Sequence, residues 1–184
     1  KNEPTAEHLD AVKAGLPNLL RHVSNIKDVF KLPVVVAINA FPTDTAAELR
    51  LVEDECNKLG VNVALSEVWA KGGEGGLALA EEVVRLCEQP NDFQFAYDLD
   101  DTIANKLNAI ATKIYHADGV DYTTKAARQL KELEEQGFGK LPICVAKTQY
   151  SFTDDQHKLG APEGFRITVR NLKVSAGAGF IVAL

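Results

Sequence analysis

The sequence predicts an α/β protein: a Rossmann-like parallel sheet, followed by a smaller and more irregular α+β portion. Three observations support this class. Helical and strand-like segments alternate through the first half of the 184 residues, which is typical of a parallel sheet with crossover helices. The apolar runs are strand-sized and too short to span a bilayer. Apolar residues make up 46% and charged residues 25%, the balance of an ordinary globular protein.

The first two elements are a helix and a buried strand. Apolar side chains recur at helical spacing over residues 6–30, interrupted only by Pro17. Residues 32–38 form a continuous apolar run. Such a run predicts a strand buried on both faces, as parallel strands commonly are.

The next elements continue the alternation. A helix is predicted over residues 46–59, with an N-cap supplied by residues 43–45 and an end at Gly60. Residues 61–68 predict the second strand and residues 75–87 the third helix. The packed side of that helix is expected to carry Leu77, Leu79, Ala80, Val83, Val84 and Leu86.

The second half is less regular. Helices are predicted over residues 101–115 and 124–136, the second capped by Gly137. Strands are predicted over residues 141–147, 166–174 and 180–184, with a long loop over residues 153–164 and a small-residue turn over residues 175–180.

We place a domain boundary between residues 92 and 93. Residues 1–92 form the Rossmann-like portion and residues 93–184 the α+β portion, which we expect to be truncated at its C-terminus. The chain contains no Met, and its last residues form an apolar strand with nothing after it. We therefore expect the chain to be part of a larger protein.

Charge and cysteine usage narrow the class of protein. The net charge is −6, which argues against nucleic-acid binding, because that requires clustered Lys and Arg. Three cysteines lie far apart and the N-terminal residues are polar, which favours reduced thiols in a cytoplasmic protein without a signal peptide. The four histidines have no metal-ligand spacing, and no nucleophilic triad is recognisable. No catalytic residue or metal ligand is predicted.

The loop after the first strand is a candidate binding site, because ligands bind outside the carboxyl ends of parallel strands. Asn39 and Asp44 could meet the polar edge of a purine-like ring, Phe41 offers a flat apolar face, and Pro42 restrains the loop. The alternative is structural: Asn39 ends the strand, and Asp44 or its neighbour caps the next helix.

The loop after the second strand contains Trp69, the only Trp of the chain, followed by Lys71 and the sequence GGEGG. Glycines permit close backbone approach, and converging amides can bind an anion. An aromatic side chain beside such a turn can stack on a planar heterocycle. The alternative is a core Trp next to a flexible turn. With Phe41 at the same sheet edge, we favour two aromatic rings that hold a planar ring between them. The site residues contributed by GGEGG are Gly72, Gly73 and Glu74.

A phosphate-binding loop is missing, since no G-x-x-x-x-G-K-[ST] motif occurs in the chain. Lys147, Thr148 and Gln149 emerge at the end of a predicted strand and are a further candidate. A solvated strand exit explains them equally well.

Six segments resemble formate–tetrahydrofolate ligase, also called formyltetrahydrofolate synthetase, and more closely its single-function bacterial form. The segments, in chain order, are VVVAINAFPTDTAAEL (34–49), ALSEVWAKGGEGG (64–76), IYHADGVDYTTKA (114–126), LPICVAKTQYSFTDD (141–155), GAPEGF (160–165) and SAGAGFIVAL (175–184).

The resemblance implies a fold similar to P-loop NTPases and a parent enzyme that makes 10-formyltetrahydrofolate from formate, ATP and tetrahydrofolate. In that family formate is activated as formyl phosphate, with Mg²⁺ and a monovalent cation, and the enzyme is typically a cytoplasmic homotetramer. Phosphoryl transfer of this kind depends on positioning and charge neutralisation. The phosphate loop of the family lies upstream of the matching segments.

Carried over by position, the resemblance implies that Phe41 and Trp69 clamp a ring of folate or nucleotide. Pro42 and residues 71–76 form the surrounding walls, and Asn39 and Asp44 meet polar ring edges; Lys147 and Gln149 are weaker candidates. We therefore expect a C-terminal-half portion of this ligase that binds a heterocycle but is inactive alone. The alternative is a non-catalytic nucleotide- or cofactor-binding module, or an assembly domain.

Overall fold

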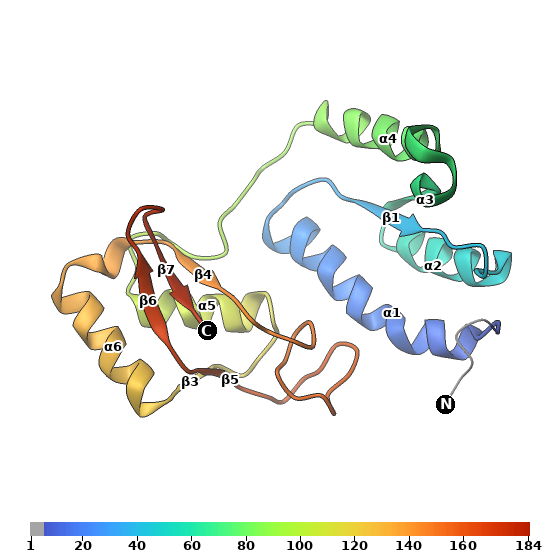
Figure 1. The fold of residues 1–184 in the computed structure, drawn as a ribbon. Coiled ribbons are helices and arrows are strands. Elements are labelled where there is room, and N and C mark those ends of the chain that lie inside the picture. Colours follow the sequence, from blue (N-terminus) through green and yellow to red (C-terminus); the bar gives the residue numbers. More distant parts are fainter. Residues whose placement is uncertain (1–5) are drawn as a thin grey trace. The chain divides into compact units, whose positions relative to one another are not determined.

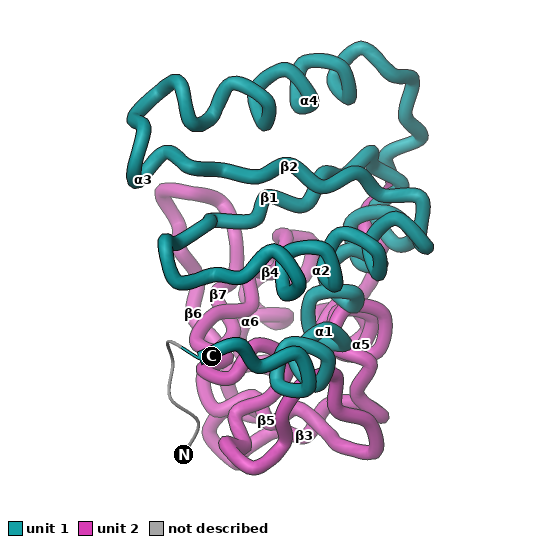
Figure 2. The backbone as a smooth tube through the Cα atoms, turned by 90° about the vertical axis from the view of Figure 1, so that its right-hand side faces the viewer, with its two compact units in different colours: residues 1–93 teal, residues 94–184 magenta. Residues whose placement is uncertain are grey.

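The computed structural model of the chain describes residues 6–184. Contacts between Cα atoms divide the chain into two compact units, residues 1–93 (unit 1) and residues 94–184 (unit 2) (Figure 2). Helices and short, mostly parallel strands make up both units. The α/β class is confirmed; a sheet of the P-loop NTPase type stays a prediction.

Unit 1 is a small three-layer structure (Figures 1 and 2). Its middle layer is a parallel pair, β1 (Val35–Asn39) and β2 (Asn62–Ser66). Helices α1 (Leu9–Ser24) and α2 (Ala46–Lys58) cover one face, and α4 (Leu77–Cys87) lies on the other. The core forms under α1 and α2, where the buried side chains are Val23, Val36, Cys56 and Val61.

The first two helices lie close to the predicted positions. Pro17 lies inside α1 without ending it, and the helix continues into a π-helical turn, η1 (Asn25–Val29). Thr45 caps α2: its hydroxyl accepts the Glu48 N–H at 3.3 Å, and the Glu48 carboxylate accepts the Thr45 N–H at 3.1 Å. The predicted N-cap is confirmed, and Gly60 follows the helix with a φ of 68°.

One expectation for unit 1 is wrong and another is met only in part. The first strand is not buried on both faces, because Ala37 of β1 is exposed on the α4 side of the sheet. The packed apolar side predicted for helix α4 is formed only in part: Leu79 and Leu86 are half-buried, but no residue of the helix is fully buried, and Leu77, Ala80, Val83 and Val84 are exposed. A polar contact also joins α4 to β2: Glu82 accepts from Asn62 at 2.8 Å and pairs with Arg85 at 2.7 Å. These contacts lower the pKa of the Glu82 carboxyl to about 2, and the hydrogen bond from Arg85 is the largest cause.

Unit 2 contains two small sheets. Strand β7 (Phe180–Ala183) lies between β4 (Ile143–Val145), to which it is parallel, and β6 (Leu172–Ser175), to which it is antiparallel. The second sheet pairs β3 (Val120–Tyr122) with β5 (Ile167–Val169) in parallel. The small-residue turn before β7 was predicted correctly and closes the β6–β7 hairpin, where Gly179 has a φ of 71°.

The single strand predicted over residues 166–174 is wrong. The chain leaves one sheet after β5 and enters the other at β6, so that two strands replace one. Strand β3 was not predicted. Its partner lies more than 40 residues away along the sequence, and a three-residue strand carries no periodicity of its own.

Two helices pack on these sheets, α5 (Ile103–Lys113) and α6 (Thr124–Glu135), as predicted. A short 3₁₀ turn, η3 (Phe138–Lys140), follows Gly137, whose φ is 85°. The core combines both helices with four strands, and its buried members are Ile103, Leu107, Ala126, Leu133, Ile143, Val169, Leu172, Ile181 and Ala183. Lys106 on α5 has no exposed surface and donates to the carbonyl oxygens of Gly139 and Leu141 at 3.0 and 3.1 Å.

Candidate functional site

The two aromatic side chains predicted to form the site lie side by side in unit 1. Strands β1 and β2 are parallel and in register, with Asn39 opposite Ser66, so their carboxyl ends meet at one edge of the sheet. Phe41 follows β1, and Trp69 lies on a one-turn helix after β2, α3 (Val68–Lys71). The ring centroids are 6.3 Å apart with an angle of 46° between the planes. Phe41 is 49% exposed and Trp69 68%, an unusual exposure for such large rings.

The Phe41 loop is held by hydrogen bonds to Asp44. The Asp44 carboxylate accepts the Phe41 N–H at 2.8 Å, and the Asp44 N–H donates to the Phe41 carbonyl at 3.0 Å. This closed turn explains why Asp follows Phe by three residues. Asn39 and Pro42 lie on the same edge with exposed side chains. The loop therefore presents the Phe41 ring on a backbone that is already fixed.

The Trp69 loop is a folded 3₁₀ turn, η2 (Gly72–Gly76). Gly72 has a φ of 60° and a ψ of −145°, a conformation that only glycine adopts readily. A Cβ on Gly75 would lie 2.4 Å from the Glu67 carbonyl oxygen, so the turn needs glycine there for close packing. Lys71 pairs with Glu67 at 2.6 Å. These contacts fix the backbone around Trp69 while leaving its ring exposed.

A comparison with known families decides the identity. A family model described as formate–tetrahydrofolate ligase matches residues 1–184. The chain belongs to the formate–tetrahydrofolate ligase family. This confirms the resemblance seen in the sequence, and the family joins formate to tetrahydrofolate. Among residues 6–184, no helix is long and apolar enough to cross a membrane.

The structure brings some predicted residues together and separates others. Those grouped at the sheet edge of unit 1 are Asn39, Phe41, Pro42, Asp44, Trp69, Lys71, Gly72, Gly73 and Glu74. Lys147 and Gln149 belong to unit 2, where they follow β4. Lys147 has a φ of 71°, which is uncommon for a non-glycine residue.

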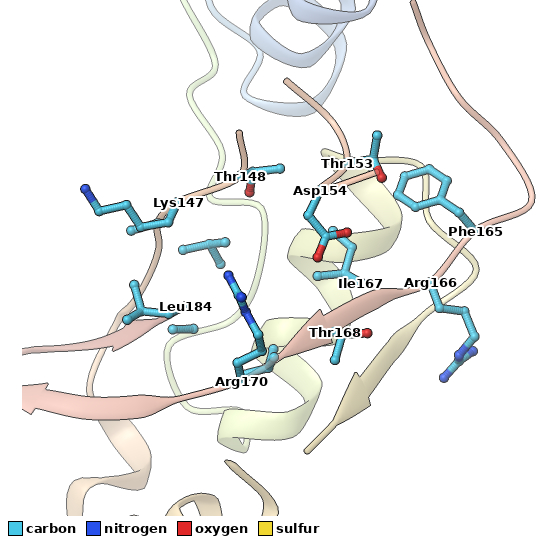
Figure 3. Close-up of a pocket in the computed structure, with 14 residues that line it drawn as sticks. Lys147, Thr148, Thr153, Asp154, Phe165, Arg166, Ile167, Thr168, Arg170 and Leu184 are labelled. Carbon is cyan, nitrogen blue, oxygen red and sulfur yellow. The ribbon is translucent and has the colours of Figure 1, made fainter. Parts of the chain in front are cut away.

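Sequence reasoning missed a pocket in unit 2 of the ligase chain (Figure 3). It lies at the carboxyl ends of the parallel strands β4 and β7, and β5 forms another wall. Thr148, Asp154 and Arg170 contribute polar groups to it. Lys147 and Thr148 are predicted at the end of a strand, whereas Asp154 and Arg170 carry no signal in the sequence, because only the fold brings them together.

Proposed function

We propose that this chain supplies the heterocycle-binding part of an ATP-dependent formate–tetrahydrofolate ligase, which forms 10-formyltetrahydrofolate through formyl phosphate. The observation that carries the proposal is the exposed pair of Phe41 and Trp69 at the carboxyl ends of two parallel strands. Strand ends of this kind are the usual ligand site in open α/β sheets. An aromatic pair offers a planar ring much contact area at a small cost in side-chain entropy.

The ring enters when the two aromatic side chains open. A ring held between two others needs them nearly parallel and about 7 Å apart, twice a carbon–carbon contact distance. The observed pair is tilted by 46° and is closer, at 6.3 Å. Phe41 is carried by the turn that Asp44 closes, so the opening movement is a side-chain rotation of Trp69. The held ring is the pterin of the folate or the adenine of ATP.

The polar groups around the pair orient the ring. One oxygen of Asp44 accepts the Phe41 N–H, and the other faces no hydrogen-bond donor of residues 6–184. That oxygen and the exposed Asn39 amide are suited to the polar edge of a heterocycle. The walls of the site are Pro42, Lys71, Gly72, Gly73 and Glu74.

The remaining chemistry requires groups that this part of the chain does not hold. Residues 6–184 contain no cluster of three His, Cys, Asp or Glu side chains suited to a metal ion. The whole sequence lacks a P-loop motif for nucleotide phosphates. The proposed enzyme is a cytoplasmic homotetramer that uses ATP, Mg²⁺ and a monovalent cation, and this chain contributes ring binding and structure.

Trp69 fluorescence tests the ring site directly, because the chain has one Trp. Tetrahydrofolate or ATP is expected to quench it saturably, after correction for absorbance with free N-acetyltryptophanamide. The Phe41→Ala variant keeps the Trp69 signal. It is expected to bind the quenching ligand about tenfold more weakly, because one stacking partner contributes about 1–3 kcal/mol. The control is Phe95→Ala, an exposed ring in unit 2, which should bind as the unmodified chain does.

The outcome separates the proposal from its alternative. A structural Trp in an assembly domain would respond to neither ligand, and the proposal would then be wrong. Equal losses of affinity in Phe41→Ala and Phe95→Ala would also contradict it, because the proposed site is built on the contact between Phe41 and Trp69.

We expect the 184-residue chain to bind without turnover. Formyl phosphate formation needs phosphate and metal sites. The sequence has no P-loop motif, and residues 6–184 show no cluster of metal-ligating side chains. The measurement is 10-formyltetrahydrofolate formation from formate, ATP-Mg²⁺ and tetrahydrofolate. Product formed in proportion to the concentration of purified chain, and abolished by heat denaturation, would show that the chain is catalytic by itself.

A further inference from the structure

Gly75, in the turn η2, packs against the peptide bond between Glu67 and Val68. A Cβ atom on Gly75 would lie 2.4 Å from the Glu67 carbonyl oxygen and 2.9 Å from the Val68 nitrogen. Because Cβ atoms essentially never approach other heavy atoms within 3.0 Å, a side chain here requires a backbone shift of about 0.6 Å. The φ of Gly75 is not positive. The close contact, and not the backbone conformation, therefore requires glycine at this position.

The same peptide bond begins the helical turn that carries Trp69. The Glu67 carbonyl accepts the N–H groups of Ala70 at 3.0 Å and Lys71 at 2.9 Å, which are the first hydrogen bonds of α3. The Glu67 N–H donates to the Gly75 carbonyl at 2.9 Å. Glu67 therefore connects Gly75 to the turn of Trp69 through backbone contacts alone.

The strand that precedes this peptide bond is held in place. Ser66 ends β2, and its carbonyl accepts the Ala40 N–H at 3.0 Å. Phe41 follows directly, in a turn closed by hydrogen bonds of its own. A shift imposed by a side chain at Gly75 is therefore passed on to α3, where it moves Trp69 relative to Phe41.

We propose that Gly75 is a positioning residue of the ring site, which sets the distance between Trp69 and Phe41 through Glu67. The inference rests on the proposed function, in which these two aromatic side chains hold a planar ring between them. The attraction between two surfaces falls by about a quarter to a half when they separate by about 0.5–1 Å. The shift of about 0.6 Å lies within this range. Gly75 thus acts on the ligand through Trp69.

The first test needs no ligand and uses the ¹⁵N-labelled 184-residue chain. The chain has one Trp, so its indole N–H gives one signal, whose dependence on the neighbouring ring is measured with Phe41→Ala. Gly75→Ala is expected to shift this signal and to change the NOE intensities between the two rings. The matched control is Gly15→Ala in α1, where a Cβ meets no atom within 4 Å, and it should leave the indole signal in place.

Unshifted core amides of unit 1 verify that each variant is folded. Gly76→Ala is a milder change in the same turn, since its Cβ would meet the end of the Val68 side chain at 3.0 Å. It is expected to give a smaller indole shift, and it decides the question if Gly75→Ala does not fold. An unmoved indole signal in a folded Gly75→Ala variant would overturn the proposal, because the turn and not α3 would then have given way.

The second test measures binding of the ligand that quenches Trp69. Gly75→Ala is expected to weaken it by about threefold to tenfold, and Gly15→Ala should bind as the unmodified chain does. In the Phe41→Ala background, Gly75→Ala should cause little further loss, because a ligand stacked on Trp69 alone can follow it. Losses that simply add would indicate general damage to the loop and would contradict a positioning role. If no ligand quenched the unmodified chain, the proposed function would be wrong, whereas the indole shift would still decide the role of Gly75.

Discussion

Replacing Lys106 by alanine is expected to lower the free energy of unfolding of unit 2 by about 3–5 kcal/mol. The side chain is fully buried in α5, and its ammonium group donates to the carbonyls of Gly139 and Leu141. Alanine would leave a cavity and two buried carbonyls without donors. Hydrogen exchange of peptides from α5 and η3 measures the effect in unit 2 separately from unit 1.

The matched control for Lys106 is Lys113→Ala on the same helix. Lys113 is exposed and donates to one carbonyl, that of Ala96, at 2.8 Å. Loss of the Lys113 hydrogen bond is expected to lower the free energy of unfolding of unit 2 by about 1 kcal/mol. If both variants lost protection against hydrogen exchange to the same extent, the buried ammonium group would have no special role in the stability of unit 2.

The Lys106 ammonium group also links stability to pH. Burial lowers its pKa, with the charge of Lys140 as the next cause. The unfolded chain therefore binds the proton more tightly than the folded chain does. The free energy of unfolding consequently rises with pH through the lowered pKa, up to the unfolded value of about 10.4. Lys106→Met has no such group, so its stability should lack this rise when it is compared with the unmodified chain.

Phe152→Ala is expected to destabilise unit 2 by about 3–5 kcal/mol and to open the loop over the unit 2 pocket. The Phe152 ring fills the space under a loop whose backbone has positive φ at Lys147 and Ser151. Without the ring, that loop can return to ordinary backbone conformations. Hydrogen exchange of residues 147–155 should increase strongly. The control is Tyr150→Ala in the same loop, where the ring is exposed; if it had the same effect, the anchoring role of Phe152 would be wrong.

Much of the fold follows from local sequence signals. The Thr45–Glu48 capping box, the glycine that ends α2 and the helical spacing in α5 and α6 are short-range patterns, and these elements form where they are predicted. The predictions fail where contacts between residues far apart in the sequence determine the structure. Residues 166–174 were predicted as one strand although the apolar positions change phase after Val169, at Arg170 and Asn171. In the structure β5 and β6 pair with different partners.

Helix α4 shows the same limit. Its apolar residues predict a packed side, but the helix is joined to the sheet by polar contacts at Asn62 and Glu82. An apolar pattern shows which residues could be buried, and only the arrangement of neighbouring elements shows which ones are. The exposed faces of Leu77 and Val84 could not be predicted from composition.

The candidate site in unit 1 was found by one general rule, that loops after neighbouring parallel strands meet. The rule predicts that Phe41 and Trp69 lie at one edge, and they do. It does not predict the tilt of 46° between their rings. The same rule applied to β4 could have found the second pocket, but Arg170 lies between β5 and β6, in a segment that was wrongly predicted as one strand.

The place of β7 in its sheet determines when unit 2 can form during protein synthesis. Phe180–Ala183 is the last strand of the chain and pairs with both β4 and β6. The three-stranded sheet therefore cannot assemble until the ribosome has released Ala183. The parallel pair of unit 1 needs nothing beyond Ser66 and can form while unit 2 is still being translated. The order of the strands along the sequence thus lets the β1–β2 pair form before the sheet of unit 2, in which β4 has to wait for β7.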